Sequence, residues 1–451
     1  MRKVNTTQQR IGKLVDNNSF SEIITETGTM AVVGTGRIYG RPVFIVAFQS
    51  SYFQPDAVFD TISKIVVFLE RVLAEKKPLL FIHDTPELPR NSGSTPLSPD
   101  YLRLLTDRRG MGRVYCLLAR LAEIVPTVSV LLGKVASAQA FPVALSNAAV
   151  MTKSAGLCMG RPEVVQQMVG EEVSFSEIGG ADIHSIVTGT VDKVVENEKQ
   201  AIDWARRYLS YLPLRQGDCI PKGDCCLPTG NIAMAKTMVG LGTPFDMHEL
   251  IDSFIDAASL LELREDYARE VITGLARVNG LTLGIVASNS ANSGGILFVR
   301  SCRKISRFIL MCNTFGIPLL FLADVPGFMI GVEAEQSGII SAGAALFSVL
   351  AKITVKKMCI VTRKAFTGGL YAMCGPGFDT DVFLAFPAAS IGVYSKETLQ
   401  RINLDQQTNT PETGENVQQL LEQGLLDKVI APEQLRDTIG DFLTNVFKKV
   451  E

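Results

Sequence analysis

The sequence predicts an α/β protein made of two copies of one structural unit. Two observations support this prediction: the first half of the chain is similar to the second half, and short β-rich runs alternate with amphipathic helical stretches in both halves. Continuous apolar strands that alternate with helices are typical of a mostly parallel sheet buried between helices. The length of 451 residues also exceeds what one hydrophobic core usually supports.

Four pairs of matching segments carry the internal repeat, in the same order in both halves. They are GRIYGRPVFIVA (36–47) with ARVNGLTLGIVA (276–287), PLLFIHDTP (78–86) with PLLFLADVP (318–326), VSVLLGKVASAQAF (128–141) with MCIVTRKAFTGGLY (358–371), and VTGTVDKVVENE (187–198) with EQGLLDKVIAPE (422–433). The first two pairs share one offset, and the later offsets are only slightly smaller. We therefore expect two domains, residues 1–220 and 221–451, joined through a stretch rich in Gly, Pro and Cys at 212–230.

The second copy shows the expected elements in order. Strands rich in β-branched and other apolar residues are predicted at 281–288, 318–326, 356–364 and 382–393, and helical patterns at 294–316, 339–354 and 369–375. Because helical segments separate the strands, neighbouring strands can run parallel.

Composition and charge exclude several functional classes. The 44 basic and 46 acidic side chains nearly cancel, which gives no electrostatic basis for binding nucleic acid or an acidic membrane. No apolar run approaches the roughly 18 residues of a membrane span, and the N-terminal stretch lacks the apolar region of a signal peptide. We therefore expect a cytoplasmic protein. The nine cysteines include no CxxC pair, so we expect reduced thiols and no metal site.

The candidate site begins in VTRKAFTGGLYAM (361–373), where a predicted strand ends in two glycines and a helix follows. Such a junction points several backbone N–H groups at one spot, which suits an oxygen that carries partial negative charge. A packing role alone for Gly368 and Gly369 is the alternative. Two further glycine-containing loops, DVPGFMIG (324–331) and NSANSGGIL (289–297), follow predicted strands in the same half.

Conventional catalytic side chains are scarce. None of the three histidines, His83, His184 and His248, has an obvious nucleophile or metal-ligand pattern around it. Packing or capping roles are favoured for His184 and for Glu177. Chemistry at this site would therefore depend on backbone donors that stabilise an enolate or a similar oxyanion.

Long segments around these loops resemble the carboxyltransferase (β) subunit of biotin-dependent acyl-CoA carboxylases of the propionyl-CoA and methylcrotonyl-CoA carboxylase type. In the second half they are GIPLLFLADVPGFMIG, SGIISAGAALFSVLAKITVKKMCIVTRKAFTGGLYAMCGPGF and FPAASIGV, and in the first half QRIGKLVDNNSFSEI, GEEVSFSEIGGADIHSIVTGTVDKVVENE and YLPL. The resemblance runs from about Gln9 to the C-terminus. It implies two tandem crotonase-fold (ββα spiral) domains, in agreement with the internal duplication.

The resemblance also implies a biotin site in the second domain. Gly368 and Gly369 match the catalytic pair whose amides hold the ureido oxygen of biotin. The residues implied to line the same pocket are Asp324, Val325, Pro326, Gly327, Phe328, Gly294 and Gly295.

The implied reaction moves a carboxyl group from carboxybiotin to the α-carbon of an acyl thioester through an enolate, with one oxyanion hole in each domain. Biotin is carried on a separate protein, so a biotin carboxylase and a biotin carboxyl carrier protein are implied partners beside the acyl-CoA or acyl-carrier substrate. The resemblance further implies dimer units, typically in a hexamer, with each active site between the N-domain of one subunit and the C-domain of another.

The first half departs from the family pattern on the thioester side. GKVASAQAFPVAL (133–145) stands where the family has a Gly-Gly hole, which makes Ser137 and Ala138 the catalytic candidates there. HDTPELPRNSG (83–93) and FQPDAVFDT (53–61) replace two other glycine-containing stretches of the family's acyl-CoA site. The thioester-binding candidates are Asp84, Thr85, Ala136 and Gln139.

Three functions therefore stay open at this point. The chain carboxylates an acyl thioester of unusual shape or one carried on a protein; it is a biotin-dependent or CoA-independent decarboxylase of the same fold; or it is a non-catalytic paralogue that completes a hetero-oligomeric carboxyltransferase. A catalytic subunit should turn over a thioester by itself, whereas an architectural subunit should act only together with a second carboxyltransferase chain.

Overall fold

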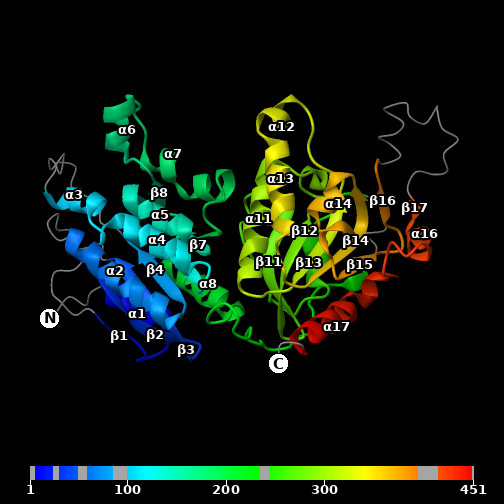
Figure 1. Ribbon diagram of the computed structural model, residues 1–451, viewed down its shortest axis with the longest axis horizontal. Coiled ribbons are helices and arrows are strands. Elements are labelled where there is room, and N and C mark those ends of the chain that lie inside the picture. Colours follow the sequence, from blue (N-terminus) through cyan, green and yellow to red (C-terminus); the bar gives the residue numbers. More distant parts are fainter. Residues whose placement is uncertain are drawn as a thin grey trace. The chain divides into compact units, whose positions relative to one another are not determined.

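The computed structural model describes residues 6–23, 30–48, 58–84, 99–233, 243–394 and 415–448. The chain divides into two compact units, Met1–Asp218 and Cys219–Glu451 (Figure 1). Each unit holds a mixed sheet together with helices, so the predicted α/β class is confirmed. Within the described ranges, the helices are too short or too polar to cross a membrane.

The first unit is built on a seven-stranded sheet with the order β1-β2-β3-β4-β5-β7-β9. The strands are β1 (Ser21–Glu22), β2 (Ala31–Ile38), β3 (Arg41–Phe48), β4 (Leu79–His83), β5 (Thr127–Leu131), β7 (Ala148–Thr152) and β9 (Lys193–Val195), and a separate pair is formed by β6 (Lys134–Ala136) and β8 (Gly156–Cys158). The helices are α1 (Thr6–Leu14), α2 (Val58–Glu75), α3 (Pro99–Thr106), α4 (Met111–Leu121), α5 (Ala140–Leu145), α6 (Pro162–Val169), α7 (Phe175–Gly179) and α8 (Glu198–Tyr211). Strands β1 to β3 are antiparallel neighbours, and the pairs from β3–β4 onward are parallel.

The second unit holds a nine-stranded sheet with the main order β10-β11-β12-β13-β14-β15-β18. The strands are β10 (Leu261–Glu262), β11 (Val271–Val278), β12 (Leu281–Ser288), β13 (Leu319–Val325), β14 (Lys357–Phe366), β15 (Val382–Ala385), β16 (Ser390–Gly392), β17 (Glu415–Asn416) and β18 (Lys428–Val429). The helices are α10 (Met247–Asp252), α11 (Val299–Thr314), α12 (Val332–Gln336), α13 (Ile339–Leu350), α14 (Gly368–Ala372), α16 (Val417–Glu422) and α17 (Leu435–Lys448).

Strand pairing confirms the internal duplication. In the first unit Leu79 of β4 lies opposite Thr127 of β5, and in the second unit Leu319 of β13 lies opposite Lys357 of β14. The two pairs are related by the same offsets as the matching sequence segments. The antiparallel pairs β2–β3 and β11–β12 repeat in the same way.

The predicted strand at 382–393 is wrong as a single element. Residues 382–385 form β15, residues 390–392 form β16, and a turn that contains Pro387 separates them. Both strands pair with β14, but with different parts of it. A proline has no N–H to donate to a ladder, so the strand is interrupted where it occurs.

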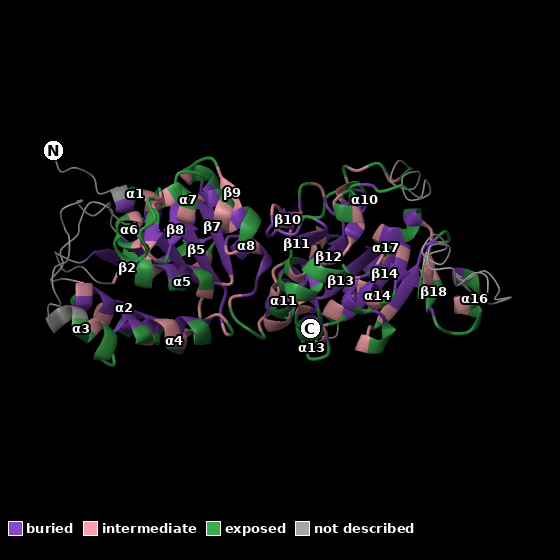
Figure 2. Cartoon of the chain, turned by 90° about the horizontal axis from the view of Figure 1, so that it is seen from above, coloured by how far each residue is buried: buried purple, intermediate pink, exposed green. Residues whose placement is uncertain are grey.

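Both sheets are covered on their two faces, which explains the near-continuous apolar strands. Every residue of β13 is buried. In the first unit α2 and α4 pack against β2, β3 and β4, and in the second unit α10 and α17 pack against the central strands. The strands are accordingly purple along most of their length in Figure 2, while the outer surfaces of the helices are green.

An aspartate clamp fixes the β11–β12 hairpin of the second unit. The Asp256 carboxylate accepts hydrogen bonds from the amides of Asn279 (3.1 Å) and Gly280 (2.7 Å), the two turn residues with left-handed backbones. Arg436, from α17, completes the clamp with an Nη2–Oδ1 distance of 2.7 Å. The hairpin is thereby tied to the last helix of the unit.

The first unit repeats this clamp in a more exposed setting. Asp16 accepts from the amides of Tyr39 (3.1 Å) and Gly40 (2.7 Å), and Arg206 lies 3.1 Å from the same carboxylate. The side chain of Asp16 is 31% exposed, against 2% for Asp256. The same motif should therefore contribute more stability where water is excluded.

We expect Asp256→Ala to destabilise the second unit by about 3–5 kcal/mol, because it leaves the amides of Asn279 and Gly280 without their buried acceptor and removes the carboxylate partner of the largely buried Arg436. Asp16→Ala should cost only about 1–2 kcal/mol, since water can reach the freed groups. Urea unfolding of both variants measures the difference. Equal losses of unfolding free energy would contradict the assignment of the larger effect to burial.

Candidate functional site

The first element of the candidate site is the turn that joins β14 to α14. β14 ends at Phe366, Thr367 has a left-handed backbone with φ 49°, and α14 begins at Gly368. The amides of Gly368 and Gly369 are the first two of this helix, where no intrahelical acceptor exists. Outside the hydrogen bonds of the regular elements, neither amide donates to an acceptor in the described residues. Two main-chain donors are therefore available, as an oxyanion hole requires.

The loop after β13 touches this turn through its backbone. A Cβ atom on Gly369 would lie 2.8 Å from Val325 Cγ2 and 3.0 Å from Gly327 Cα. A Cβ atom on Gly368 would meet only the ring of Phe328, at 3.0 Å. The packing role that the sequence left open therefore holds for Gly369. It coexists with the free amide of the same residue.

The loop after β12 joins the other two. The Leu297 amide donates to the Gly327 carbonyl oxygen at 3.0 Å, which links the loops after β12 and β13. Gly295 has φ 76°, and a Cβ atom there would lie 2.7 Å from the Asp324 carbonyl oxygen. Gly294, with φ 63°, has no such neighbour within 4 Å. The structure therefore brings the predicted biotin-side residues into one cluster.

Two residues of this cluster lie beneath the surface. Asp324 and Val325 are fully buried, and Asp324 Oδ2 lies 3.0 Å from Arg363 Nη2. The side chains therefore support the loops from within. The sequence prediction missed Arg363, although a charged residue shortly after the apolar run 358–361 in a predicted buried strand is a signal that could have identified it.

The turn after β14 has an equivalent in the first unit. Ala136 ends β6 and Phe366 ends β14, and each strand pairs in parallel with a three-residue strand further along its unit, β6 with β8 and β14 with β16. The next residues, Ser137 and Thr367, share the left-handed backbone, with φ 58° and 49°. The two turns therefore share a positive φ at the equivalent position, although a 3₁₀ turn (Ser137–Gln139) occupies this place in the first unit and α14 follows in the second.

In this register, Ala138 and Gln139 are the counterparts of Gly368 and Gly369. The resemblance to the family places the oxyanion hole one residue earlier, at Ser137 and Ala138, so Ala138 is common to both descriptions. Both residues lie in the 3₁₀ turn Ser137–Gln139, and outside the hydrogen bonds of the regular elements the Ala138 amide donates to no acceptor in the described residues. Both units thus have main-chain donors at this turn, but in the first unit the donor residues, Ala138 and Gln139, carry side chains.

The other thioester-side candidates occupy different settings. Asp84 is only 8% exposed and forms a salt bridge with Arg10 of α1, so its carboxylate is already paired. Ala136 is partly buried at the end of β6. Thr85 lies outside the described residues, as do most residues of the two replaced loops.

The histidines of the first unit have structural contacts. His83 Nε2 lies 3.1 Å from Ser129 Oγ, and burial lowers the pKa of this ring to about 3. His184 Nε2 lies 2.5 Å from the Leu157 carbonyl oxygen, and burial lowers its pKa. Glu177 completes a capping box at the start of α7. These contacts agree with the packing and capping roles favoured from the sequence.

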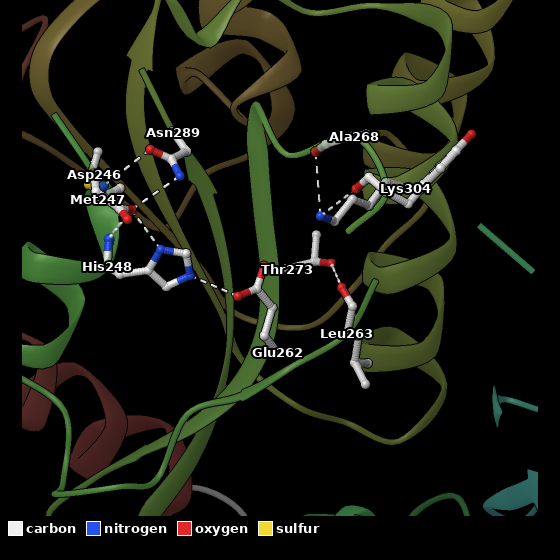
Figure 3. Close-up of polar contacts among 10 residues, drawn as sticks. Asp246, Met247, His248, Glu262, Leu263, Ala268, Thr273, Asn289 and Lys304 are labelled. Carbon is white, nitrogen blue, oxygen red and sulfur yellow. Dashed lines mark hydrogen bonds and ion pairs between the residues drawn. The ribbon is translucent and has the colours of Figure 1, made fainter. Parts of the chain in front are cut away.

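The third histidine, His248, lies in a polar cluster that connects α10 to β10 (Figure 3). Its Nδ1 lies 2.6 Å from Asp246 Oδ1 and its Nε2 lies 2.7 Å from Glu262 Oε2. Burial favours the neutral ring, but the hydrogen bonds and charges of Glu262 and Asp246 outweigh it and raise the pKa to about 9. Nearby, Lys304 donates to the Tyr267 carbonyl oxygen at 2.8 Å, and burial lowers its pKa to about 8.

In the parts of the chain that the structure describes, no group of three His, Cys, Asp or Glu side chains could hold a metal ion. The glycine loops offer main-chain amides that can donate hydrogen bonds to an anionic oxygen.

The chain belongs to the carboxyl transferase domain family, because residues 5–87 and 102–447 match the profile of that family. An uncharacterised carboxylase of Bacillus subtilis, YngE, is 34% identical over 91% of this chain and 82% of its own length. The beta5 subunit of the biotin-dependent acetyl-/propionyl-coenzyme A carboxylase of Mycobacterium leprae is 30% identical over 99% of this chain and 87% of its own length.

A solved structure supports the same assignment. The transcarboxylase 12S structure, described as a hexamer and solved with hydrolysed methylmalonyl-coenzyme A bound, matches with a TM-score of 0.87 and 27% identity. The match covers 97% of this chain and 89% of the other. The fold is therefore a pair of crotonase-fold domains, as the sequence predicts.

We expect the stability of the second unit to fall between about pH 6.5 and 8. The folded-state pKa of His248 lies above its ordinary value of 6.5, so its contribution is complete below pH 6.5 and is lost as the pH rises through 9. Lys304 has a lowered folded-state pKa of about 8, so between pH 8 and 10.5 its contribution to stability rises with pH, opposite to that of His248. His248→Gln should remove the fall, and His184→Gln should keep it.

Thermal unfolding between pH 6 and 9 measures this effect, at about 2–4 °C for each kcal/mol lost. A fall of equal size in the His248→Gln variant would contradict the role given to this residue.

We expect Gly369→Ala to destabilise the second unit by about 1–3 kcal/mol, because the new methyl group must displace the Gly327 backbone. Gly368→Ala should cost less, since it meets only the Phe328 ring. Chemical denaturation measures the free energy of unfolding of both variants. A larger loss of unfolding free energy for Gly368→Ala than for Gly369→Ala would refute this expectation.

Proposed function

We propose that this chain is the carboxyltransferase component of a biotin-dependent acyl-CoA carboxylase, and that it moves a carboxyl group between carboxybiotin on a carrier protein and the α-carbon of an acyl thioester. The observation that carries the proposal is the pair of unpartnered amides at Gly368 and Gly369, where three glycine-containing loops meet in a member of the carboxyl transferase family.

The second unit fits a urea-type carbonyl. When bound, biotin supplies the carboxyl group and a ureido oxygen on which negative charge develops. The amides of Gly368 and Gly369 donate to that oxygen, and the absence of a Cβ at Gly368 leaves room beside Phe328. Pro326 and Gly294 would line the same pocket. Because the donors belong to the main chain, they need no protonation change during the reaction.

The first unit is proposed to hold the thioester. The amides of Ala138 and Gln139, with the Ser137 turn that positions them, would stabilise the enolate oxygen that forms when the α-proton leaves. The Gln139 side chain stands where the second unit has glycine, so we propose that it contacts the acyl group. Ala136 would lie beside it.

The remaining assignments follow from the same proposal. The domains 1–220 and 221–451 would serve the thioester and biotin sides, a separate biotin carboxylase and carrier protein would supply the carboxyl group, and the protein would act in the cytoplasm. A homo-oligomer of dimer units is proposed because the related 12S protein is described as a hexamer.

An architectural role is the second candidate. It is favoured by one observation: Ala138 and Gln139 bring side chains to the positions where the second unit has two glycines. A chain with this role would offer its second unit to the first unit of a different carboxyltransferase. The decarboxylase alternative uses the same amides. It would be detected as release of carbon dioxide from malonyl-CoA or methylmalonyl-CoA without transfer of the carboxyl group to biotin.

We expect the isolated chain to transfer label from radiolabelled malonyl-CoA or methylmalonyl-CoA to free biotin, and Gly368→Val to lower this rate by on the order of a hundredfold or more. The valine side chain would occupy the space in front of the amides. Gly377→Val is the matched control, because Gly377 has no neighbour within 4 Å of a Cβ atom.

An unchanged rate of label transfer to biotin in Gly368→Val would contradict the assignment of the oxyanion hole to the amides of Gly368 and Gly369. Transfer that appears only after a second carboxyltransferase chain is added would support the architectural role instead.

A further inference from the structure

Arg363 is a buried cation that joins segments far apart in the sequence. Its Nε lies 3.2 Å and its Nη2 3.0 Å from Asp324 Oδ2. Nη2 also donates to Ser290 Oγ at 3.2 Å, and Nη1 donates to the Thr243 carbonyl oxygen. The guanidinium carbon lies 5.2 Å from the centroid of the Phe245 ring. Because Arg363 is only 8% exposed, water cannot readily replace these contacts.

The contacts of this guanidinium reach all three loops of the candidate site. Asp324 lies at the end of β13, directly before the loop that approaches the α14 turn. Ser290 begins the loop after β12 that carries Gly295. Arg363 itself lies in β14, shortly before Gly368. One side chain therefore connects the three strand ends.

An irregularity in β14 explains how an arginine can occupy this place. Ala323 of β13 pairs with Val361, but Val325 pairs with Ala365, so β14 contains two more residues than β13 in this interval. Arg363 lies within those extra residues. A bulge of this kind bends the strand and changes the direction of its side chains.

The first unit lacks this arrangement. The residue equivalent to Arg363 is Gly133, and Asp84, the equivalent of Asp324, pairs with Arg10 of α1 instead. The two units thus keep a buried carboxylate at the same strand end but hold it from different elements. The link between three loops is a property of the second unit.

We propose that Arg363 is a positioning residue that fixes the three glycine loops relative to one another, and thereby places the Gly368 and Gly369 amides. Its effect on catalysis rests on the proposed function, whereas its effect on loop packing does not. Lysine cannot replace it, because a single ammonium group lacks the planar set of donors that reaches Asp324, Ser290 and Thr243 together.

The test compares Arg363→Lys with Arg436→Lys. Arg436 is a matched control because it pairs with a buried aspartate, Asp256, and with main-chain oxygens in the same unit, at a hairpin that carries no residue of the candidate site. Two readouts are used: the separate KM values for free biotin and for methylmalonyl-CoA, and amide hydrogen exchange at Leu297 and Met329, whose amides link the loops.

We expect Arg363→Lys to raise the KM for biotin by about 10- to 100-fold and to leave the KM for the thioester unchanged. Exchange at Leu297 and Met329 should become faster. Arg436→Lys should lower the unfolding temperature without either change. A purely structural role for Arg363 would lower the active fraction with both KM values intact.

Ser290→Ala keeps the test decisive if Arg363→Lys does not fold, because it removes one of the guanidinium contacts and should shift both readouts in the same direction by a smaller amount. Wild-type exchange rates at Leu297 and Met329 in the folded variant would overturn the inference. If the wild-type chain does not turn over biotin, the proposed function fails, and the exchange measurement still decides the role of Arg363.

Discussion

The approach of two main chains at Gly327 and Gly369 is the constraint on which the candidate site depends. A side chain at position 369 would fall 3.0 Å from the Gly327 Cα atom, so a larger residue would separate the turn after β14 from the loop after β13. The same contact sets Phe328 beside Gly368. Because the turn leaves its first two amides without acceptors, the packing and the donors arise from one local geometry. The chemistry of the site therefore cannot be changed independently of its packing.

The parts of the fold that the sequence predicts are those whose signal is local. The strand at 281–288 is apolar along its whole length and is found as β12. The segment 382–393 is also apolar, but Pro387 divides it into two strands, a local signal that the prediction overlooked; which part of β14 each strand meets is not encoded locally. Arg363 could not be predicted as a link, because its partners lie 39, 73 and 120 residues away. Sequence alignment finds a glycine pair readily, whereas the left-handed residue before it becomes visible only in three dimensions.

Comparison of the two duplicated units distinguishes features of the oxyanion hole that depend on the backbone from features that depend on side chains. Ser137 and Thr367 share a positive φ although their neighbours differ, so this feature of the turn persists in both units. Ala138 and Gln139 then add side chains where the second unit has none. A hole formed by amides tolerates such changes, because its donors belong to the main chain. Divergence at these positions therefore alters the space available to a ligand more than the ability to stabilise an oxyanion.

Two residues with strained backbones lie in the loops that the buried ion pair of Arg363 and Asp324 joins. Ser293 and Thr367, with φ 48° and 49°, are non-glycine residues in the left-handed region, and the branched side chain of threonine makes that conformation costly. Such conformations cost about 1–3 kcal/mol each and persist only where surrounding contacts hold them. In the second unit both residues lie in loops that meet Arg363 or its partners, and the Leu297 amide adds a main-chain link between the loops after β12 and β13. The strained residues and the guanidinium therefore lie in the same set of loops in the second unit. Ser137 keeps a positive φ of 58° in the first unit, where Gly133 replaces the arginine, so the turn itself does not require the guanidinium, and the role left to Arg363 is to hold the loops relative to one another.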